Sequence, residues 1–247
     1  MLFCVLGPIE VRAPDGVYSL ERSMRRAALA YLLLHADRVV SLDQLEDALW
    51  GGAAPASARA LMHSTVSRIR QVLREAGCTD QLVTRPGGYR LTVHPGQLDL
   101  EVFKEHTSRG RAAAGTGRHE EAAEAFQAAL GLWRGPALGG ASAAFVAASR
   151  EHLEDQRILT YEDLIEAELA RGRHAEITTE LGGLADANPL RERLTGQLML
   201  ALYRCGRQAD ALAAYHRLRT RLADQLGLDP DASCGSGTRP SCAPIPP

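Results

Sequence analysis

The sequence predicts a chain in two parts, an α+β N-terminal part followed by an all-α part of helical repeats. Before residue 97, strand-like segments and turn signals alternate with helices of clear apolar periodicity. From Leu98 onward the strand signals disappear, and a Gly-Arg-x-x-acid pattern recurs between helical segments. These observations divide the chain into residues 1–96, residues 98–230 and a tail, 231–247.

The chain begins with short apolar runs that predict strands. Leu2–Leu6 and Ile9–Val11 form the first two, and Val17–Leu20 returns after a turn signal at Asp15-Gly16. A helix is then expected from Ser23, as its N-cap, through His35.

A second helix is predicted to begin at Ser41-Leu-Asp-Gln44, which has the form of a capping box. Its inward positions would be Leu42, Leu45, Ala48 and Leu49, and Gly51-Gly52 would end it.

A third helix is predicted over Ser57–Ala76, opened by Pro55 and Ser57 and ended by Gly77. Apolar side chains at Met62, Val66, Ile69 and Leu73, with Val72 beside them, predict the face that packs inward. The opposite face carries polar side chains spaced by three or four residues: Arg59, His63, Ser67, Arg70 and Arg74.

A short β-hairpin is expected after this helix. Its strands would be Gln81–Thr84 and Tyr89–Val93, joined by a turn, Arg85-Pro-Gly-Gly88, with an arginine at the tip. Two such short strands are not stable alone, so they are expected to pack against the helices.

The charge pattern of this helix and hairpin favours DNA recognition. The whole chain has a net charge of −2, yet six arginines and two acids between Arg59 and Arg90 give a local balance of +4. The arginine fork suits guanine edges and phosphate oxygens, and the helix and hairpin together could reach a major groove and a neighbouring minor groove. The competing interpretation is a solvated surface face.

Other features exclude several classes of protein. The five cysteines are scattered without metal-ligand spacing, and no apolar stretch is long enough to span a bilayer. His63, His119 and His174 have no partners at catalytic or metal spacing. We therefore expect a cytoplasmic, nucleoid-associated protein that is not an enzyme, has no cofactor or metal and contacts no membrane.

The second part contains an internal repeat. Gly172-Arg-His-Ala-Glu176 recurs 34 residues later as Gly206-Arg-Gln-Ala-Asp210, and an earlier copy is Gly117-Arg-His-Glu-Glu121. A period of about 34 residues is that of tetratricopeptide (TPR) repeats, which pair two helices in each copy. A generic helical bundle is the alternative. The tail, residues 231–247, has the composition of a disordered segment.

Taken together, these segments resemble the streptomycete antibiotic regulatory proteins (SARPs). The first part resembles an OmpR-type winged helix-turn-helix domain, and the second resembles the bacterial transcriptional activator domain. The segments that carry the resemblance are Arg25–Leu29, Ala36–Leu45, Ala48–Gly51, Val66–Arg70, Gly87–Arg90, Leu98–Leu100 with Phe103, Leu132–Leu138 and Leu226–Pro230. An ATPase module is expected to be absent, since no phosphate-binding Gly-rich loop with Lys-Ser/Thr is found. A receiver domain is not expected either, so the sequence does not support control by aspartate phosphorylation.

The resemblance implies a pathway-specific transcriptional activator of an antibiotic or other secondary-metabolite gene cluster. Such a protein would bind direct repeats in promoter DNA as a dimer and recruit RNA polymerase through its sigma or alpha subunit. The implied DNA-binding residues are Arg59, His63, Ser67, Arg68, Arg70, Arg74 and, at the tip of the hairpin or wing, Arg85. The implied polymerase-contact loop is Gly51, Gly52, Ala53, Ala54, Pro55 and Ala56.

Two other functions fit parts of the sequence. A winged-helix repressor would use the same DNA chemistry with the opposite output. A helical-repeat scaffold would instead dock proteins, but a docking face would expose aromatic or leucine side chains where this chain has arginines.

Overall fold

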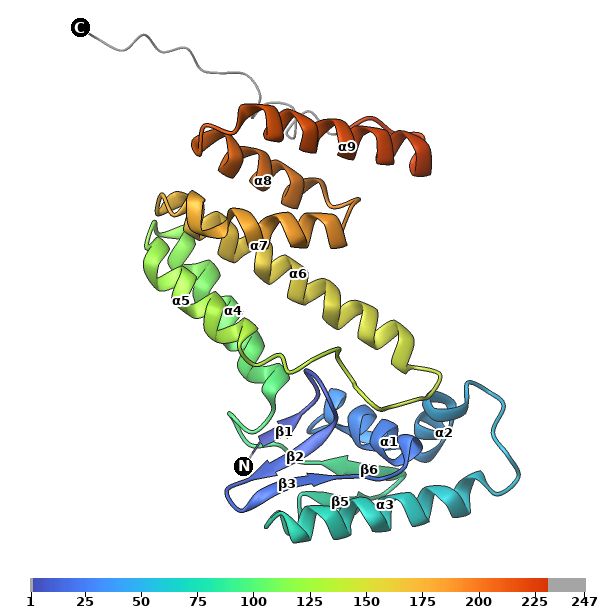
Figure 1. The fold of residues 1–247 in the computed structure, drawn as a ribbon. Coiled ribbons are helices and arrows are strands. Elements are labelled where there is room, and N and C mark those ends of the chain that lie inside the picture. The colour runs from blue at the N-terminus through green and yellow to red at the C-terminus, as the bar shows by residue number, and fades with distance from the viewer. Residues whose placement is uncertain (1, 231–247) are drawn as a thin grey trace, which may run out of the picture. The chain divides into compact units, whose positions relative to one another are not determined.

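The computed structural model describes residues 2–230, so the tail for which disorder was expected, 231–247, lies outside the described residues. The chain forms two compact units (Figure 1). Of the described residues, the first unit joins 2–109 with Gln127–Thr160, and the second joins Gly110–Phe126 with 161–230. No helix within residues 2–230 combines the length and the apolarity needed to cross a lipid bilayer.

The first unit begins with an antiparallel sheet in the order β1-β2-β3, with bounds Leu2–Cys4, Glu10–Ala13 and Gly16–Ser19. Val11 in the central strand pairs with Phe3 on one side and Tyr18 on the other. The expected first strand, Leu2–Leu6, ends early at Cys4. The N–H groups of Val5 and Leu6 donate to the side chain of Asp99 instead of to a neighbouring strand.

Three helices follow as predicted: α1 (Ser23–Leu34), α2 (Leu42–Trp50) and α3 (Ala58–Glu75). The capping box is confirmed, because Gln44 N donates to Ser41 Oγ at 3.0 Å and Ser41 N donates to Gln44 Oε1 at 2.9 Å. The expectation that Ser23 caps α1 is wrong, since Ser23 lies inside the helix and the N-cap position is Arg22. Ser57 does occupy the N-cap position of α3, but its side chain makes no capping hydrogen bond.

A second antiparallel sheet has the order β4-β6-β5, with bounds Val39–Ser41, Gly88–Leu91 and Leu82–Arg85. The β5–β6 hairpin was predicted, but β4, the third strand of this sheet, was not. It has only three residues, directly before the capping box, which is too few to show an alternation of apolar and polar side chains. β4 approaches β6 so closely that a Cβ on Gly88 would lie 2.0 Å from the carbonyl oxygen of Val40. A glycine is therefore required at this position.

The core of the first unit continues past residue 97. Asp99, the first residue of α4 (Asp99–Gly115), is 1% exposed and accepts hydrogen bonds from the Val5 and Leu6 N–H groups at 2.9–3.0 Å. Arg134 pairs with Asp99 at 3.0 Å and also with Glu10. Further apolar side chains from this region join the same core: Leu98, Leu100, Phe103, Trp133, Ala137, Leu138, Val146 and Leu153.

The remaining helices are α5 (His119–Leu130), α6 (Val146–Ala170), α7 (His174–Ala187), α8 (Glu192–Arg204) and α9 (Gln208–Leu226). Figure 1 shows α7, α8 and α9 stacked in chain order within the second unit. In this unit α4 and α5 approach closely at Gly110, where a Cβ would lie 2.6 Å from the ring of Phe126.

The three Gly-Arg-x-x-acid segments share one geometry, which confirms that they are repeated turns. Each glycine is left-handed, with φ of 75°, 78° and 74° at Gly117, Gly172 and Gly206. The arginine that follows each glycine pairs with the acid three residues later in the first turn of the next helix. The pairs are Arg118–Glu121 at 2.6 Å, Arg173–Glu176 and Arg207–Asp210 at 2.7 Å.

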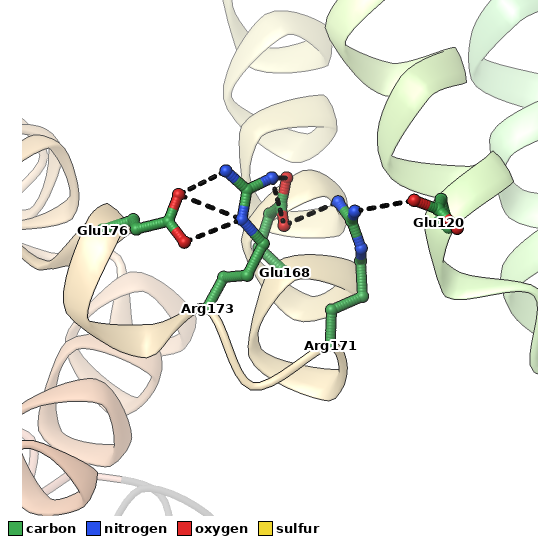
Figure 2. A network of polar contacts seen from close by, with 5 residues as sticks. All are labelled: Glu120, Glu168, Arg171, Arg173 and Glu176. Carbon is green, nitrogen blue, oxygen red and sulfur yellow. Dashed lines mark hydrogen bonds and ion pairs between the residues drawn. The ribbon is translucent and has the colours of Figure 1, made fainter.

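The middle turn extends this pair into a network (Figure 2). The side chain of Glu168, 4% exposed, accepts hydrogen bonds from Arg171 at 3.0 Å and Arg173 at 3.4 Å. Arg171 also reaches Glu120 at 3.1 Å, so the network ties the start of α5 to the turn between α6 and α7. The attraction between these charges offsets the cost of burying the Glu168 carboxylate.

Candidate nucleic-acid interface

The inward face of α3 fixes which of its side chains point outward. Met62, Val66, Ile69 and Leu73 are each at most 1% exposed, as the apolar spacing predicted. Since side chains three and four residues apart share one face of a helix, the arginine face must lie on the opposite side. Arg59, His63, Ser67 and Arg74 are accordingly exposed.

The N-terminal part of this face carries one loosely paired arginine. The guanidinium of Arg59 lies 3.6 Å from Asp43 and 3.9 Å from Glu46, and its side chain is 72% exposed. Exposed pairs at such distances contribute about 0–1 kcal/mol. Arg59 could therefore exchange these carboxylates for a phosphate at little cost.

Two other arginines present guanidinium groups without a hydrogen bond or ion pair among residues 2–230. Arg68 is half-buried on α3, and Arg85 is exposed at the end of β5. Arg85 pairs with Gly88 across a two-residue tip of Pro86 and Gly87, and Gly87 has a φ of 86°. The tip therefore has no bulky side chain that would hold Arg85 away from a ligand.

Arg70 has surroundings that the helix pattern did not predict. Its Nε donates to the carbonyl oxygen of Leu82 at 2.9 Å, and an Nη donates to Thr84 Oγ1 at 2.8 Å. Its guanidinium also lies 5.8 Å from the centre of the Tyr89 ring. Arg70 thus lies against the wing, which is the hairpin of β5 and β6. Direct DNA contact by this residue stays a prediction from the sequence.

His63 is also engaged with the wing, since the hydroxyl of Tyr89 lies 3.0 Å from its Nδ1. Sequence reasoning missed both Tyr89 and Thr84 as parts of this surface. The hairpin register could have indicated them. Thr84 pairs with Tyr89, and cross-strand partners lie on the same face of a sheet, so both side chains belong to one face of the hairpin.

The loop between α2 and α3 is exposed over its whole length, residues 51–56. It begins with two left-handed glycines, Gly51 at φ 60° and Gly52 at φ 81°, and it carries no charge. A Cβ on Gly51 would lie 3.0 Å from that of Ala144, which belongs to the same compact unit. The loop is therefore anchored at one end and open to solvent beyond it.

Two family models match the chain. Residues 98–236 match the bacterial transcriptional activator domain, which accounts for more than half of the chain. Residues 22–91, which contain α1 to β6, match the C-terminal domain of transcriptional regulatory proteins. The chain belongs to the streptomycete antibiotic regulatory protein family of transcriptional activators. Both domains of this SARP family member are those of transcriptional regulators rather than enzymes.

Individual relatives agree with this membership. The SARP chain is 38% identical over 232 residues to transcriptional regulatory protein MoaR1 of Mycobacterium tuberculosis, covering 92% of this chain and 75% of MoaR1. It is 37% identical over 228 residues to regulatory protein AfsR of Streptomyces griseus, covering 92% of this chain but 23% of AfsR.

A solved structure of Mycobacterium tuberculosis EmbR, in complex with a low-affinity phosphopeptide, has the same fold. The two chains superpose with a TM-score of 0.91 at 37% identity, over 96% of this chain and 63% of that one. The fold class predicted from the sequence, a winged helix followed by a helical domain, is therefore confirmed. Because this SARP chain spans only part of EmbR and AfsR, their full activities and partners do not transfer with the fold.

Proposed function

We propose that this protein binds promoter DNA sequence-specifically, with α3 in the major groove and the wing in the adjacent minor groove. The observation that carries this proposal is the pair of guanidinium groups of Arg68 and Arg85, which have no hydrogen-bond or ion-pair partner within residues 2–230 and lie on two elements of one compact unit. Arginine at a groove floor or edge is well suited to base and phosphate recognition. The other proposed contacts are Arg59, His63, Ser67 and Arg74 on the exposed face of α3.

Selection from a pool of random duplexes tests this function. The purified full chain should enrich one sequence, with an affinity that falls steeply as salt rises, because each phosphate contact releases counterions. Enrichment of no sequence above background would contradict specific recognition.

We infer further that two copies bind direct repeats as a dimer and recruit RNA polymerase at a secondary-metabolite promoter in the cytoplasm. Family membership supports this inference. The selected site should contain two copies of one half-site in the same orientation. Changing their spacing by about half a turn of DNA, roughly 5 base pairs, should weaken binding, because the second copy would face the other side of the duplex.

Transcription in vitro separates the activator from its two rivals. With purified RNA polymerase and the selected site upstream of a promoter, an activator raises the amount of transcript and a repressor lowers it. A scaffold that does not engage DNA leaves it unchanged. A scrambled site in the same template is the control.

A further inference from the structure

Five residues join the recognition helix to the wing. His63 and Arg70 lie two turns apart on α3, which places them on one face of the helix. Arg70 bonds the Leu82 carbonyl and the Thr84 hydroxyl of β5, while His63 meets the hydroxyl of Tyr89 in β6. Both strands of the hairpin are therefore held by side chains of the helix.

The wing depends on these bonds because of where it lies in the sheet. β5 is an edge strand, with β6 on one side only. An edge strand leaves backbone groups without a strand partner, and the guanidinium of Arg70 supplies a donor for one of them, the Leu82 carbonyl. β4 pairs with β6 on its other side, so β5 is the wing strand whose outer edge depends on such support.

We propose that Arg70 is a positioning residue, which sets the distance between α3 and Arg85 so that both reach DNA together. The proposal rests on the DNA-binding function stated above. When two contacts are made by one rigid body, the second follows at little entropic cost, and this advantage falls when the link between them is loose. Losing Arg70 would leave Arg85 present but poorly placed.

A double-mutant cycle distinguishes positioning from direct contact. If Arg70 acts through the wing, Arg70→Ala weakens DNA binding in the parent chain but has little further effect in the Arg85→Ala background. Coupled residues depart from additivity by about 2- to 150-fold in affinity. Additive effects of Arg70→Ala and Arg85→Ala would mean that Arg70 makes an independent contact, which overturns the proposal.

Arg74→Ala provides the matched control. Arg74 is an exposed arginine on the same helix, one turn from Arg70, and its Nε donates to the Arg70 carbonyl oxygen at 3.4 Å rather than to the wing. Its effect should add to that of Arg85→Ala. Coupling of Arg74 as strong as that of Arg70 would count against a specific role for Arg70.

Hydrogen–deuterium exchange of the full chain without DNA tests the positioning independently of the proposed function. Arg70→Ala should speed amide exchange in residues 82–91 while exchange in α3 stays as in the parent. Thr84→Val, which removes one acceptor and keeps the arginine, should give a smaller change in the same direction. Unchanged exchange of the wing in both variants would overturn the proposal, whether or not the protein binds DNA.

Discussion

At the scale of single residues, similar arginines in one short stretch have different surroundings. Arg85 lies exposed at the wing tip, Arg59 is loosely paired, and Arg70 is bonded to the hairpin. A helical pattern can place all of them near one surface, but it does not show which guanidinium groups are already engaged. That difference decides what each substitution is expected to change.

Arg85→Ala is expected to weaken DNA binding and to lower the slope of log affinity against log salt by about 0.9, the value for one lost phosphate contact. Fluorescence anisotropy over a range of salt concentrations measures both quantities. Arg217→Ala on α9 removes the same charge from an exposed position in the other compact unit and should leave the slope unchanged. An unaltered slope for Arg85→Ala would mean that the wing tip does not touch a phosphate.

Gly88→Ala is expected to destabilise the first unit by at least about 1–3 kcal/mol, the usual cost of overpacking, because the added methyl group would collide with the Val40 carbonyl. Urea unfolding monitored by circular dichroism measures the change. Gly16→Ala is a suitable control, since a Cβ there meets no atom within 4 Å. Equal stability of the two variants would contradict the close approach of β4 to β6.

At the scale of whole elements, amphipathic helices were predictable and short strands were not. α3 was predicted over Ser57–Ala76 and spans Ala58–Glu75, because its apolar period repeats over several turns. β4 has three residues and no period, so the partner strand of β6 could not be recognised. The bonds between α3 and the wing depend on how two elements pack, which a pattern along one element does not contain.

The α2–α3 loop carries a prediction at this scale. Ala54→Glu should leave DNA affinity nearly intact and reduce transcription from a target promoter, because it adds charge to an exposed, uncharged loop proposed to meet RNA polymerase. Ala175→Glu, on the exposed surface of α7, is the matched control. Full transcription by Ala54→Glu with purified polymerase would make the loop a plain connector.

The repeated turns should differ in how much their arginines contribute to stability. Arg207→Ala removes a pair whose two side chains are more than half exposed, so the loss is expected to be about 0–1 kcal/mol. Arg171→Ala deprives the buried Glu168 carboxylate of one guanidinium partner, and we expect a loss of about 1–3 kcal/mol. Thermal unfolding should rank the variants in that order, and the reverse order would be inconsistent with a buried network.

At the scale of the whole molecule, the sequence predicts a domain boundary at residue 97, but the core of the first unit includes residues on both sides of it. The family models also change there, with one ending at residue 91 and the next beginning at residue 98. Yet Asp99, Arg134 and Leu138 all bond to backbone or side chains between Val5 and Glu10. These bonds argue against independent folding of residues 1–96.

A fragment of residues 1–96 is therefore expected to unfold at lower urea concentration than the first unit does in the full chain. Cys4 provides a direct probe, because burial, and next the Asp99 carboxylate, raise the pKa of its thiol to about 12. Iodoacetamide should modify Cys4 slowly in the full chain and faster in the fragment. Equal rates would show that the N-terminal sheet needs nothing beyond residue 96.

The carboxylate of Asp99 also bears on how such regulators could be rearranged during evolution. A recombination event at the sequence boundary would transfer a DNA-binding module without Asp99, so the N–H groups of Val5 and Leu6, the two residues after Cys4, would lose their hydrogen-bond acceptors. An exchange that kept residues 1–160 together would preserve the acceptor, Arg134 and the shared apolar core. Functional chimaeras of this family are thus expected to have junctions inside α6 or beyond it, rather than in the linker that separates the two family models.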